Sequence, residues 1–222
     1  FKSNGIKNIC KIPLGFDSNY FKIDYESRIQ KRKQLGVENK FVIGYFGRIS
    51  YEKGVHTLLS ALSRLLKYDW ILLIDKFDRY HNSYAKAIND QIDNEGLSDR
   101  VIYSSPSHIN IGKFMNAVDV VVMPSISTPV WVEQYGRVAP EAMACGKIVI
   151  ASNTGAIPML LNGHGILFDE GDVNDLTNTL TEIIDGGDGG LLFCSQEISD
   201  YAHKSLNTVK QAKSMLTFME SI

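Results

Sequence analysis

The fold is decided by residues 41–67, which read FVIGYFGRISYEKGVHTLLSALSRLLK. Residues 41–46 form a short, continuous apolar run. Such a run is typical of a strand that is covered on both faces, as in a parallel sheet. Residues 55–67 place apolar side chains at helical spacing, with Val55, Leu58, Leu59, Leu62, Leu65 and Leu66 on one face. The segment therefore predicts a strand, a glycine-containing basic loop and an amphipathic helix, in that order.

The same alternation continues along the chain. Further strands are predicted at 70–74, 100–103, 118–123 and 147–151. Further helices are predicted at 84–95, 111–117, 137–145, 173–184 and 197–220. Strands that alternate with helices form parallel sheets through right-handed crossovers. The predicted fold class is therefore α/β, with a Rossmann-like parallel sheet flanked by helices.

Composition narrows the class of protein. The chain has 222 residues and a formal net charge of −2, and it is 44% hydrophobic. This length can bury a full core, and the charge balance argues against nucleic acid as the main partner.

The three cysteines, Cys10, Cys145 and Cys194, are widely spaced and odd in number, which predicts reduced thiols in a cytoplasmic protein. No apolar run reaches the length of about 18 residues that a transmembrane helix needs. Four glycines within residues 186–190 predict a surface loop.

The loop after the first predicted strand carries two cations. Residues 47–54 read GRISYEKG, with Arg48 and Lys53 close to the carboxyl end of the strand. Ligands of open α/β sheets bind at this edge. Gly47 lets the backbone approach a ligand closely. Arginine binds phosphate oxygens as a bidentate fork and lysine as a point charge, so the loop is suited to a diphosphate. The alternative is a solvated basic loop.

A second motif, at residues 133–146, reads EQYGRVAPEAMACG. Pro140 predicts a helix that begins near Arg137, because proline is tolerated in a first turn. Free backbone N–H groups of Tyr135, Gly136 and Arg137 would then face the strand ends and form an anion site.

Glu133 and Glu141 flank this predicted anion site. A carboxylate beside a phosphate site needs a hydrogen-bonding role, and sugar hydroxyls provide one because carboxylates accept from them. The alternatives are a solvated loop charge for Glu133 and compensation of the helix dipole for Glu141.

These motifs together resemble the C-terminal domain of the family 4 (group 1) retaining glycosyltransferases, which have the GT-B fold. The similarity extends over about residues 9–184. Its specific part is Gly47-Arg48, Glu52-Lys53-Gly54, Pro124-Ser125, and Glu133 followed by Glu141-Ala142-Met143-Ala144 and Gly146. Weaker matches are residues 12–17, Gly155 with Ile157-Pro158, and Gly165 with Leu167 and Asp172.

The resemblance implies transfer of a hexose-type sugar from a nucleotide-diphosphate sugar, with retention of configuration. It implies that Glu133 is the catalytic residue at the transferred sugar and that Glu141 binds the ribose. It implies a nucleobase loop at Pro106 and Ser107. The diphosphate contacts that it implies are Gly47, Arg48, Lys53, Tyr135, Gly136 and Arg137.

The resemblance also implies a division of the protein into parts. Residues 1–18 would lead in from an interdomain hinge, and 19–190 would form the Rossmann-like nucleotide-sugar-binding domain. Residues 191–222 would form a helix packed on this domain or on an N-terminal domain that the chain lacks. That domain would hold a glycan or glycolipid acceptor, so the isolated chain is expected to be inactive. The expected location is cytoplasmic, or peripheral at the inner face of a membrane.

No cofactor and no obligatory metal are expected, and the chain contains no Asp-x-Asp motif. It departs from the family pattern in two places. Residues 75–78 read DKFD where the family commonly has Gly-x-Gly, and Met159 stands where a glutamate often follows Ile-Pro. Two alternatives remain within this interpretation, a non-catalytic nucleotide-sugar-binding module and a glucosyltransferase like glycogen or starch synthase. A dinucleotide oxidoreductase would need Gly-x-Gly-x-x-Gly after a first strand, which is absent.

Overall fold

Six parallel strands form the central sheet of the computed structural model, which describes residues 8–78, 82–186 and 195–221. The strands lie in the order β3-β2-β1-β4-β5-β6, and each adjacent pair is parallel. Their bounds are β1 Phe41–Tyr45, β2 Trp70–Asp75, β3 Val101–Ser104, β4 Val120–Met123, β5 Ile148–Ser152 and β6 Ile166–Phe168. This arrangement confirms the predicted α/β, Rossmann-like class.

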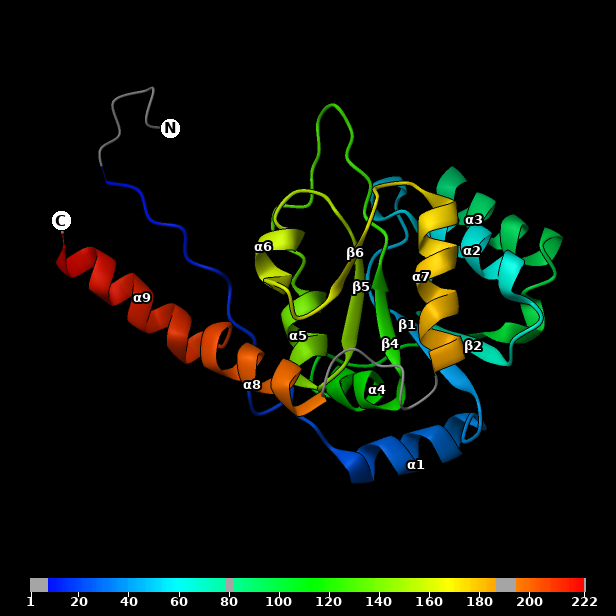
Figure 1. The fold of residues 1–222 in the computed structure, drawn as a ribbon, viewed down its shortest axis with the longest axis horizontal. Helices are drawn as coiled ribbons and strands as arrows, with labels where there is room; N and C mark the ends of the chain where they lie inside the picture. Colours follow the sequence, from blue (N-terminus) through cyan, green and yellow to red (C-terminus); the bar gives the residue numbers. More distant parts are fainter. Residues whose placement is uncertain (1–7, 79–81, 187–194, 222) are drawn as a thin grey trace.

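Helices cover both faces of the sheet (Figure 1). One face carries α2 (Val55–Leu62), α3 (Ser83–Asn94) and α7 (Val173–Gly186). The other carries α4 (Ile111–Ala117), α5 (Val138–Ala144) and α6 (Ile157–Leu161). Outside this second layer, α1 (Tyr25–Leu35) packs on α4 and α8 (Ser195–Ser205) packs on α5. Single-turn 3₁₀ helices also lie at Tyr51–Lys53, Ser63–Leu65 and Ser98–Arg100.

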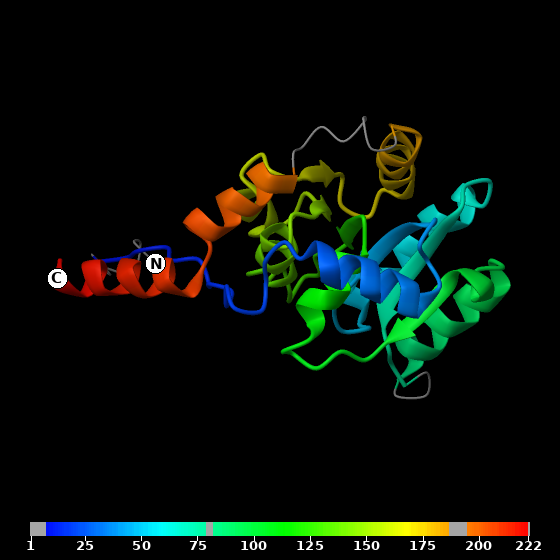
Figure 2. The same cartoon turned by 90° about the horizontal axis from the view of Figure 1, so that it is seen from below.

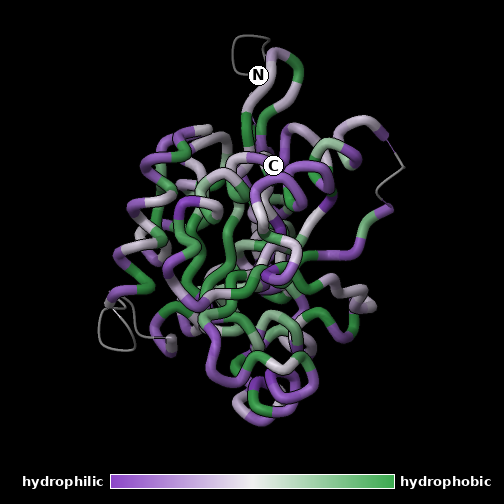
Figure 3. The backbone as a smooth tube through the Cα atoms, turned by 90° about the vertical axis from the view of Figure 1, so that its right-hand side faces the viewer, coloured by the Kyte–Doolittle hydropathy of each residue, from purple (hydrophilic) through white to green (hydrophobic). Residues whose placement is uncertain are grey.

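The hydrophobic core lies along the sheet and under the inner faces of these helices. Every residue of β4 and β5 is buried, as continuous apolar runs predict for strands covered on both sides. Figure 3 shows the hydrophobic segments gathered in the centre of the molecule and the polar ones around them. A sheet packed in this way fixes the carboxyl ends of its strands along one edge, and the loops of that edge form the site described below.

The C-terminal part differs from the prediction. The prediction of a single helix over 197–220 is wrong, because the chain forms α8 and then α9 (Thr208–Glu220). The break has a tertiary cause. Phe16 donates its N–H to the carbonyl of Leu206 and accepts from the N–H of Thr208, each at 3.1 Å. Asn207 then caps α9 by accepting from the N–H of Lys210 at 2.8 Å.

The two C-terminal helices differ in burial. α8 buries Ile198, Ser199 and Ala202, and the hydroxyl of Ser199 donates to the carbonyl of Ala144 on α5 at 2.8 Å. α9 has no buried residue, and it extends away from the sheet beside the N-terminal segment (Figures 1 and 2). α8 is therefore part of the domain core, whereas α9 is held mainly through its first turn.

Other expectations have mixed outcomes. β6, α1 and α6 were not predicted. The predicted glycine loop begins at Gly186, the last residue of α7, and residues 187–190 lie outside the described part of the chain. Cys10 and Cys145 are free thiols, while Cys194 also lies outside it. Within the described residues, no helix combines the length and apolar character required to cross a membrane.

Replacement of Gly54 by alanine tests the junction between the basic loop and α2. Gly54 has a φ of 65°, and a Cβ there would overlap the carbonyl oxygen of Pro124, which follows β4. We expect Gly54→Ala to lower the free energy of unfolding by about 3–4 kcal/mol, measured by urea denaturation. Gly96 is a matched control, because its φ is 68° but a Cβ would meet nothing within 4 Å. Gly96→Ala should cost only the strain of about 1–2 kcal/mol, and equal losses for the two variants would contradict this explanation.

Candidate functional site

A cavity of about 490 Å³ lies at the carboxyl ends of β1 and β4. The loop after β1 contributes Gly47, Arg48 and Lys53 to its lining. The loop after β4 and the start of α5 contribute Glu133, Tyr135, Gly136, Arg137 and Glu141. The fold thus brings together every residue that the sequence predicted for the diphosphate, the sugar and the ribose.

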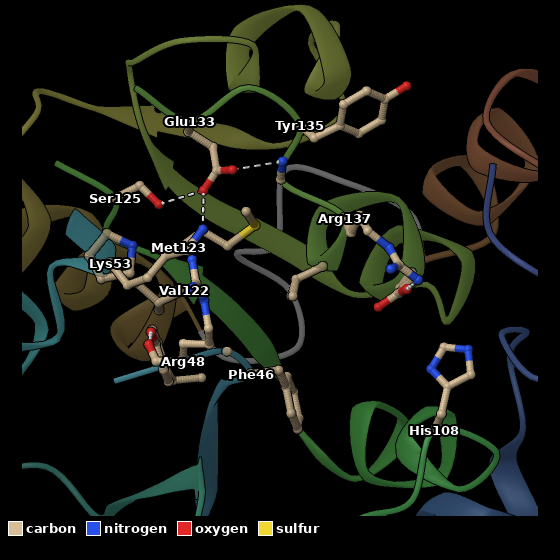
Figure 4. A pocket seen from close by; sticks show the side chains of 16 residues that line it. Phe46, Arg48, Lys53, His108, Val122, Met123, Ser125, Glu133, Tyr135 and Arg137 are labelled. Carbon is tan, nitrogen blue, oxygen red and sulfur yellow. Dashed lines mark hydrogen bonds and ion pairs between the residues drawn. The ribbon is translucent and has the colours of Figure 1, made fainter. Parts of the chain in front are cut away.

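Glu133 is the most heavily bonded side chain of the cavity (Figure 4). Its Oε2 accepts from Lys53 Nζ at 2.6 Å and from the hydroxyl of Ser125 at 3.0 Å, while Oε1 accepts from the N–H of Gly136 at 3.1 Å. Its side chain is only 7% exposed. Burial acts to raise the pKa of this carboxyl, but Lys53 and the other donors outweigh it, so the pKa lies below its usual value. Glu133 is therefore an ionised carboxylate in a fixed orientation.

Lys53 is held on two sides. Beside its ion pair with Glu133, its Nζ lies 4.9 Å from the ring centroid of Trp131, a cation–π contact. The loops that carry these residues are also joined by their backbones, because the N–H of Ile126 donates to the carbonyl of Glu52 at 2.8 Å. The ammonium group is thus positioned before any ligand binds.

Arg48 is held much more loosely. Its side chain is 76% exposed, and its guanidinium lies 3.8 Å from a carboxylate oxygen of Glu52. The backbone around it is fixed, since the hydroxyl of Tyr45 donates to the carbonyl of Arg48 at 2.7 Å. The N–H of Gly47 donates to Asp75 Oδ2 at 3.1 Å. The guanidinium can therefore turn toward an anion in the cavity while its backbone stays in place.

Glu141 lies in the first turn of α5, with its side chain 9% exposed. Arg137 is its ion-pair partner, with 3.7 Å between the guanidinium and the carboxylate. Burial raises the pKa of Glu141 to about 7, although the charge of Arg137 acts in the opposite direction. Glu141 thus presents a buried carboxyl to the cavity.

The predicted anion site is altered by Glu133. The N–H of Gly136 was expected to be free, but it donates to Glu133 Oε1. The ring of Tyr135 turns away from Glu133 (Figure 4), and its hydroxyl donates to the carbonyl of Ile12 at 2.9 Å. Tyr135 thus supplies its backbone, rather than its hydroxyl, to the region beside Glu133.

The predicted nucleobase loop is only partly at the cavity. Pro106 lines an adjoining cavity of about 390 Å³ that shares Gly47 and Arg48 with the first. Ser107 lines neither of these cavities, whereas His108, which was not predicted, lines the first.

Other side chains of the site were also missed. Trp131 and Tyr45 act on Lys53 and on the backbone of Arg48, and nothing in their sequence positions indicated this. Asp75 had a signal, because it ends a buried strand, but the sequence did not show that it fixes Gly47. Across the described ranges 8–78, 82–186 and 195–221, no group of three or more His, Cys, Asp or Glu side chains is placed to hold a metal ion.

The strand order reverses direction between β1 and β4, and the cavity lies at this point. A doubly wound sheet with a cavity at its switch point defines the class of open α/β proteins, whose ligands bind at this place. Within that class, residues 27–196 match the model of the family described as "Glycosyl transferases group 1". The chain belongs to this family.

Comparison with known proteins agrees with this assignment. The lipopolysaccharide core biosynthesis mannosyltransferase LpsB of Rhizobium meliloti is 27% identical over 77% of this chain and 49% of its own length. The D-inositol 3-phosphate glycosyltransferase of Mycolicibacterium smegmatis is 35% identical over 70% of this chain and 35% of its own length. The crystal structure of Alr3699/HepE of Anabaena in complex with UDP and glucose superimposes with a TM-score of 0.82 at 29% identity, covering 95% of this chain and 56% of that one. The chain spans about half or less of the length of these curated relatives.

The pKa of Glu141 leads to a pH-dependent stability. The carboxyl titrates at about 7 in the folded protein and near its ordinary value of 4.5 when unfolded. Between these two pKa values Glu141 is ionised in the unfolded chain and protonated in the folded protein. The free energy of unfolding of the wild type therefore falls as the pH rises through this range. Glu141→Gln removes the effect. Its free energy of unfolding relative to wild type should rise by on the order of 3 kcal/mol between pH 4.5 and pH 8, measured by urea denaturation.

Glu38→Gln is the matched control, because Glu38 is exposed and remote from the cavity. A rise of the same size in both variants would show that the effect does not come from the burial of Glu141. A constant difference for Glu141→Gln would show that Glu141 is not buried in the way described.

Proposed function

We propose that the cavity binds a nucleotide-diphosphate sugar and that this chain is the donor-binding half of a retaining hexosyltransferase. The observation that carries the proposal is the convergence of Arg48, Lys53, Glu133 and Glu141 on one cavity of about 490 Å³. Two cations and two carboxylates match a ligand that has a diphosphate and hydroxyl groups on both sides of it. The family assignment supports the same ligand class.

The diphosphate would lie between Lys53 and Arg48. Lys53 is already fixed by Glu133 and Trp131, so little ordering of its side chain is needed when an anion arrives. Arg48 would exchange its distant contact with Glu52 for a bidentate contact with phosphate oxygens.

The two glutamates would accept hydrogen bonds from hydroxyl groups. Glu133 would orient the transferred sugar, and Glu141 would bind the ribose. The nucleobase would extend toward the adjoining cavity, whose lining includes Pro106 but not Ser107. A base contact of this loop would therefore come from the part around Pro106. Backbone groups of Tyr135, Gly136 and Arg137 would complete the contacts around the sugar and the distal phosphate.

In the proposed reaction, the bond between the anomeric carbon and the distal phosphate oxygen breaks. The nucleoside diphosphate leaves with the electron pair. The acceptor hydroxyl attacks from the same face, forms the new bond to the anomeric carbon and passes its proton to the leaving phosphate, so configuration is retained. Arg48 and Lys53 would stabilise the charge on the leaving group. Ionised Glu133 would offset positive charge on the sugar, without forming a covalent bond to it. No metal is required in this scheme.

The names of similar proteins support particular choices of donor and acceptor for this chain. Because HepE was crystallised with UDP and glucose, uridine is the base we expect among UDP, GDP and ADP. LpsB is named as a mannosyltransferase of lipopolysaccharide core biosynthesis, which supports a hexose as the transferred sugar and a glycan or glycolipid as the acceptor. The chain spans 49% of LpsB, so we place most of the acceptor contacts in a further domain of the full-length enzyme.

Calorimetric titration with UDP, GDP and ADP tests the donor site. We expect at least one nucleotide to bind, and we expect Arg48→Ala and Glu141→Ala each to weaken binding by about tenfold to a hundredfold. Arg48→Ala removes a charge-assisted contact, and Glu141→Ala removes a buried hydrogen-bond acceptor. Arg64→Ala is the matched control, since Arg64 is exposed and bonds to Asn174 away from the cavity. Absence of binding by all three nucleotides would overturn the proposal.

Turnover tests the assignment of the chain as a donor-binding half. With UDP-glucose and a glycolipid acceptor, the 222-residue chain should release no UDP above the rate without enzyme, measured by a coupled assay. Nucleotide binding measured on the same sample controls for a folded site. Sustained transfer by this chain alone would show that it is a complete enzyme.

A further inference from the structure

A second cavity of about 490 Å³ adjoins the proposed donor site. The two cavities share Glu133 and Tyr135 in their linings. The second cavity lies between the N-terminal segment, the residues before Gly136 and the start of α6. Its apolar lining consists of Ile12, Pro13, Val132, Ala156, Met159 and Leu160.

The walls of this cavity are held by bonds between segments that are distant in sequence. The hydroxyl of Tyr135 donates to the carbonyl of Ile12, which fixes the N-terminal wall. The N–H of Ala156 donates to the carbonyl of Glu133 at 2.9 Å. Gly155 has a φ of 55°, and a Cβ there would overlap the same carbonyl, so α6 begins directly against Glu133. The cavity is therefore formed before a ligand binds, as small-molecule sites usually are.

The chemistry of the lining differs from that of the donor site. The charged residues among its lining are Lys11 and Glu133, and Glu133 is already paired with Lys53. Met159, on α6, is 51% exposed. The largely apolar lining suits a hydrocarbon group better than a sugar.

We propose that this second cavity binds the apolar part of the acceptor, so that the acceptor is an amphiphile such as a glycolipid. The inference rests on the proposed function. Glu133 would orient the donor sugar from one cavity, and the second cavity opens beside the same carboxylate. A molecule in it has its polar end where the sugar is transferred, which is the position a co-substrate must occupy. The exposed Lys11 at this cavity would favour an anionic group on that molecule.

The experiment uses n-octyl β-D-glucopyranoside below its micelle concentration as the probe and methyl β-D-glucopyranoside as its tail-free counterpart. Methyl resonances of the six methionines are followed by NMR, with Met159 assigned through Met159→Leu. The octyl compound should shift the Met159 resonance saturably, and the methyl compound should not. Met159→Glu should weaken octyl glucoside binding by about tenfold, because a charge then faces the hydrocarbon chain.

Met219→Glu is the matched control, since Met219 is 65% exposed on α9 and does not line the cavity. It should leave octyl glucoside binding unchanged. Equal weakening by both variants, equal binding of the two glucosides, or no saturable shift at Met159 would each overturn the inference.

Titration of UDP into the wild type and Met159→Glu separates this inference from the proposed function. Equal UDP binding by both proteins, with weakened octyl glucoside binding in the variant, supports the inference. UDP binding without octyl glucoside binding overturns the acceptor site and leaves the donor site standing. Octyl glucoside binding without binding of UDP, GDP or ADP overturns the proposed function, and the assignment of an acceptor with it.

Discussion

The parallel pairing of β1 with β4 is the constraint on which the site depends. Ile43 pairs with Val120 and Gly44 with Val121, and this register places the ends of the two strands next to each other. The strand order reverses here, so α2 leaves toward one face and α5 toward the other. The loops that follow the strands diverge, and a crevice opens between them. The ion pair of Lys53 with Glu133 spans that crevice. A shift of the register would separate these charges and leave the buried carboxylate of Glu133 without its ion-pair partner.

The fold was largely predictable because strands buried on both faces are continuous apolar runs in the sequence. β4 and β5 are of this kind. β6 lacks the signal, because it has three residues and Leu167 within it is 39% exposed. The break between α8 and α9 was not predictable from helical periodicity, since its cause is the backbone of Phe16 at the other end of the chain. Sequence patterns thus identified the buried strands, but they could not reveal a helix break whose cause is one distant contact.

The sequence predicted which residues line the candidate site better than it predicted how those residues bond to one another. Arg48, Lys53, Glu133 and Glu141 each follow a buried strand or begin a helix, so the topology alone brings them to one edge. The bond from Lys53 to Glu133 depends on side-chain placement across two loops, and the use of the Gly136 amide by Glu133 depends on the local path of the backbone. The base loop shows the same limit, because the local turn decides that Pro106 and His108, and not Ser107, line the cavities.

Two carboxyl groups in one proposed phosphate site present an electrostatic problem that their surroundings resolve in different ways. The charge of Glu133 is neutralised by Lys53, and its pKa is lowered despite burial. Glu141 has only a guanidinium at 3.7 Å, and burial raises its pKa to about 7, so that near neutral pH a large fraction of molecules have no charge there. An entering diphosphate would therefore meet Arg48 and Lys53 without the full repulsion of two free carboxylates. A protonated Glu141 still accepts a hydrogen bond through its carbonyl oxygen, so the ribose contact proposed for it is retained in either state. Burial of Glu141 would thus reduce repulsion toward the proposed donor without removing the hydrogen-bond acceptor.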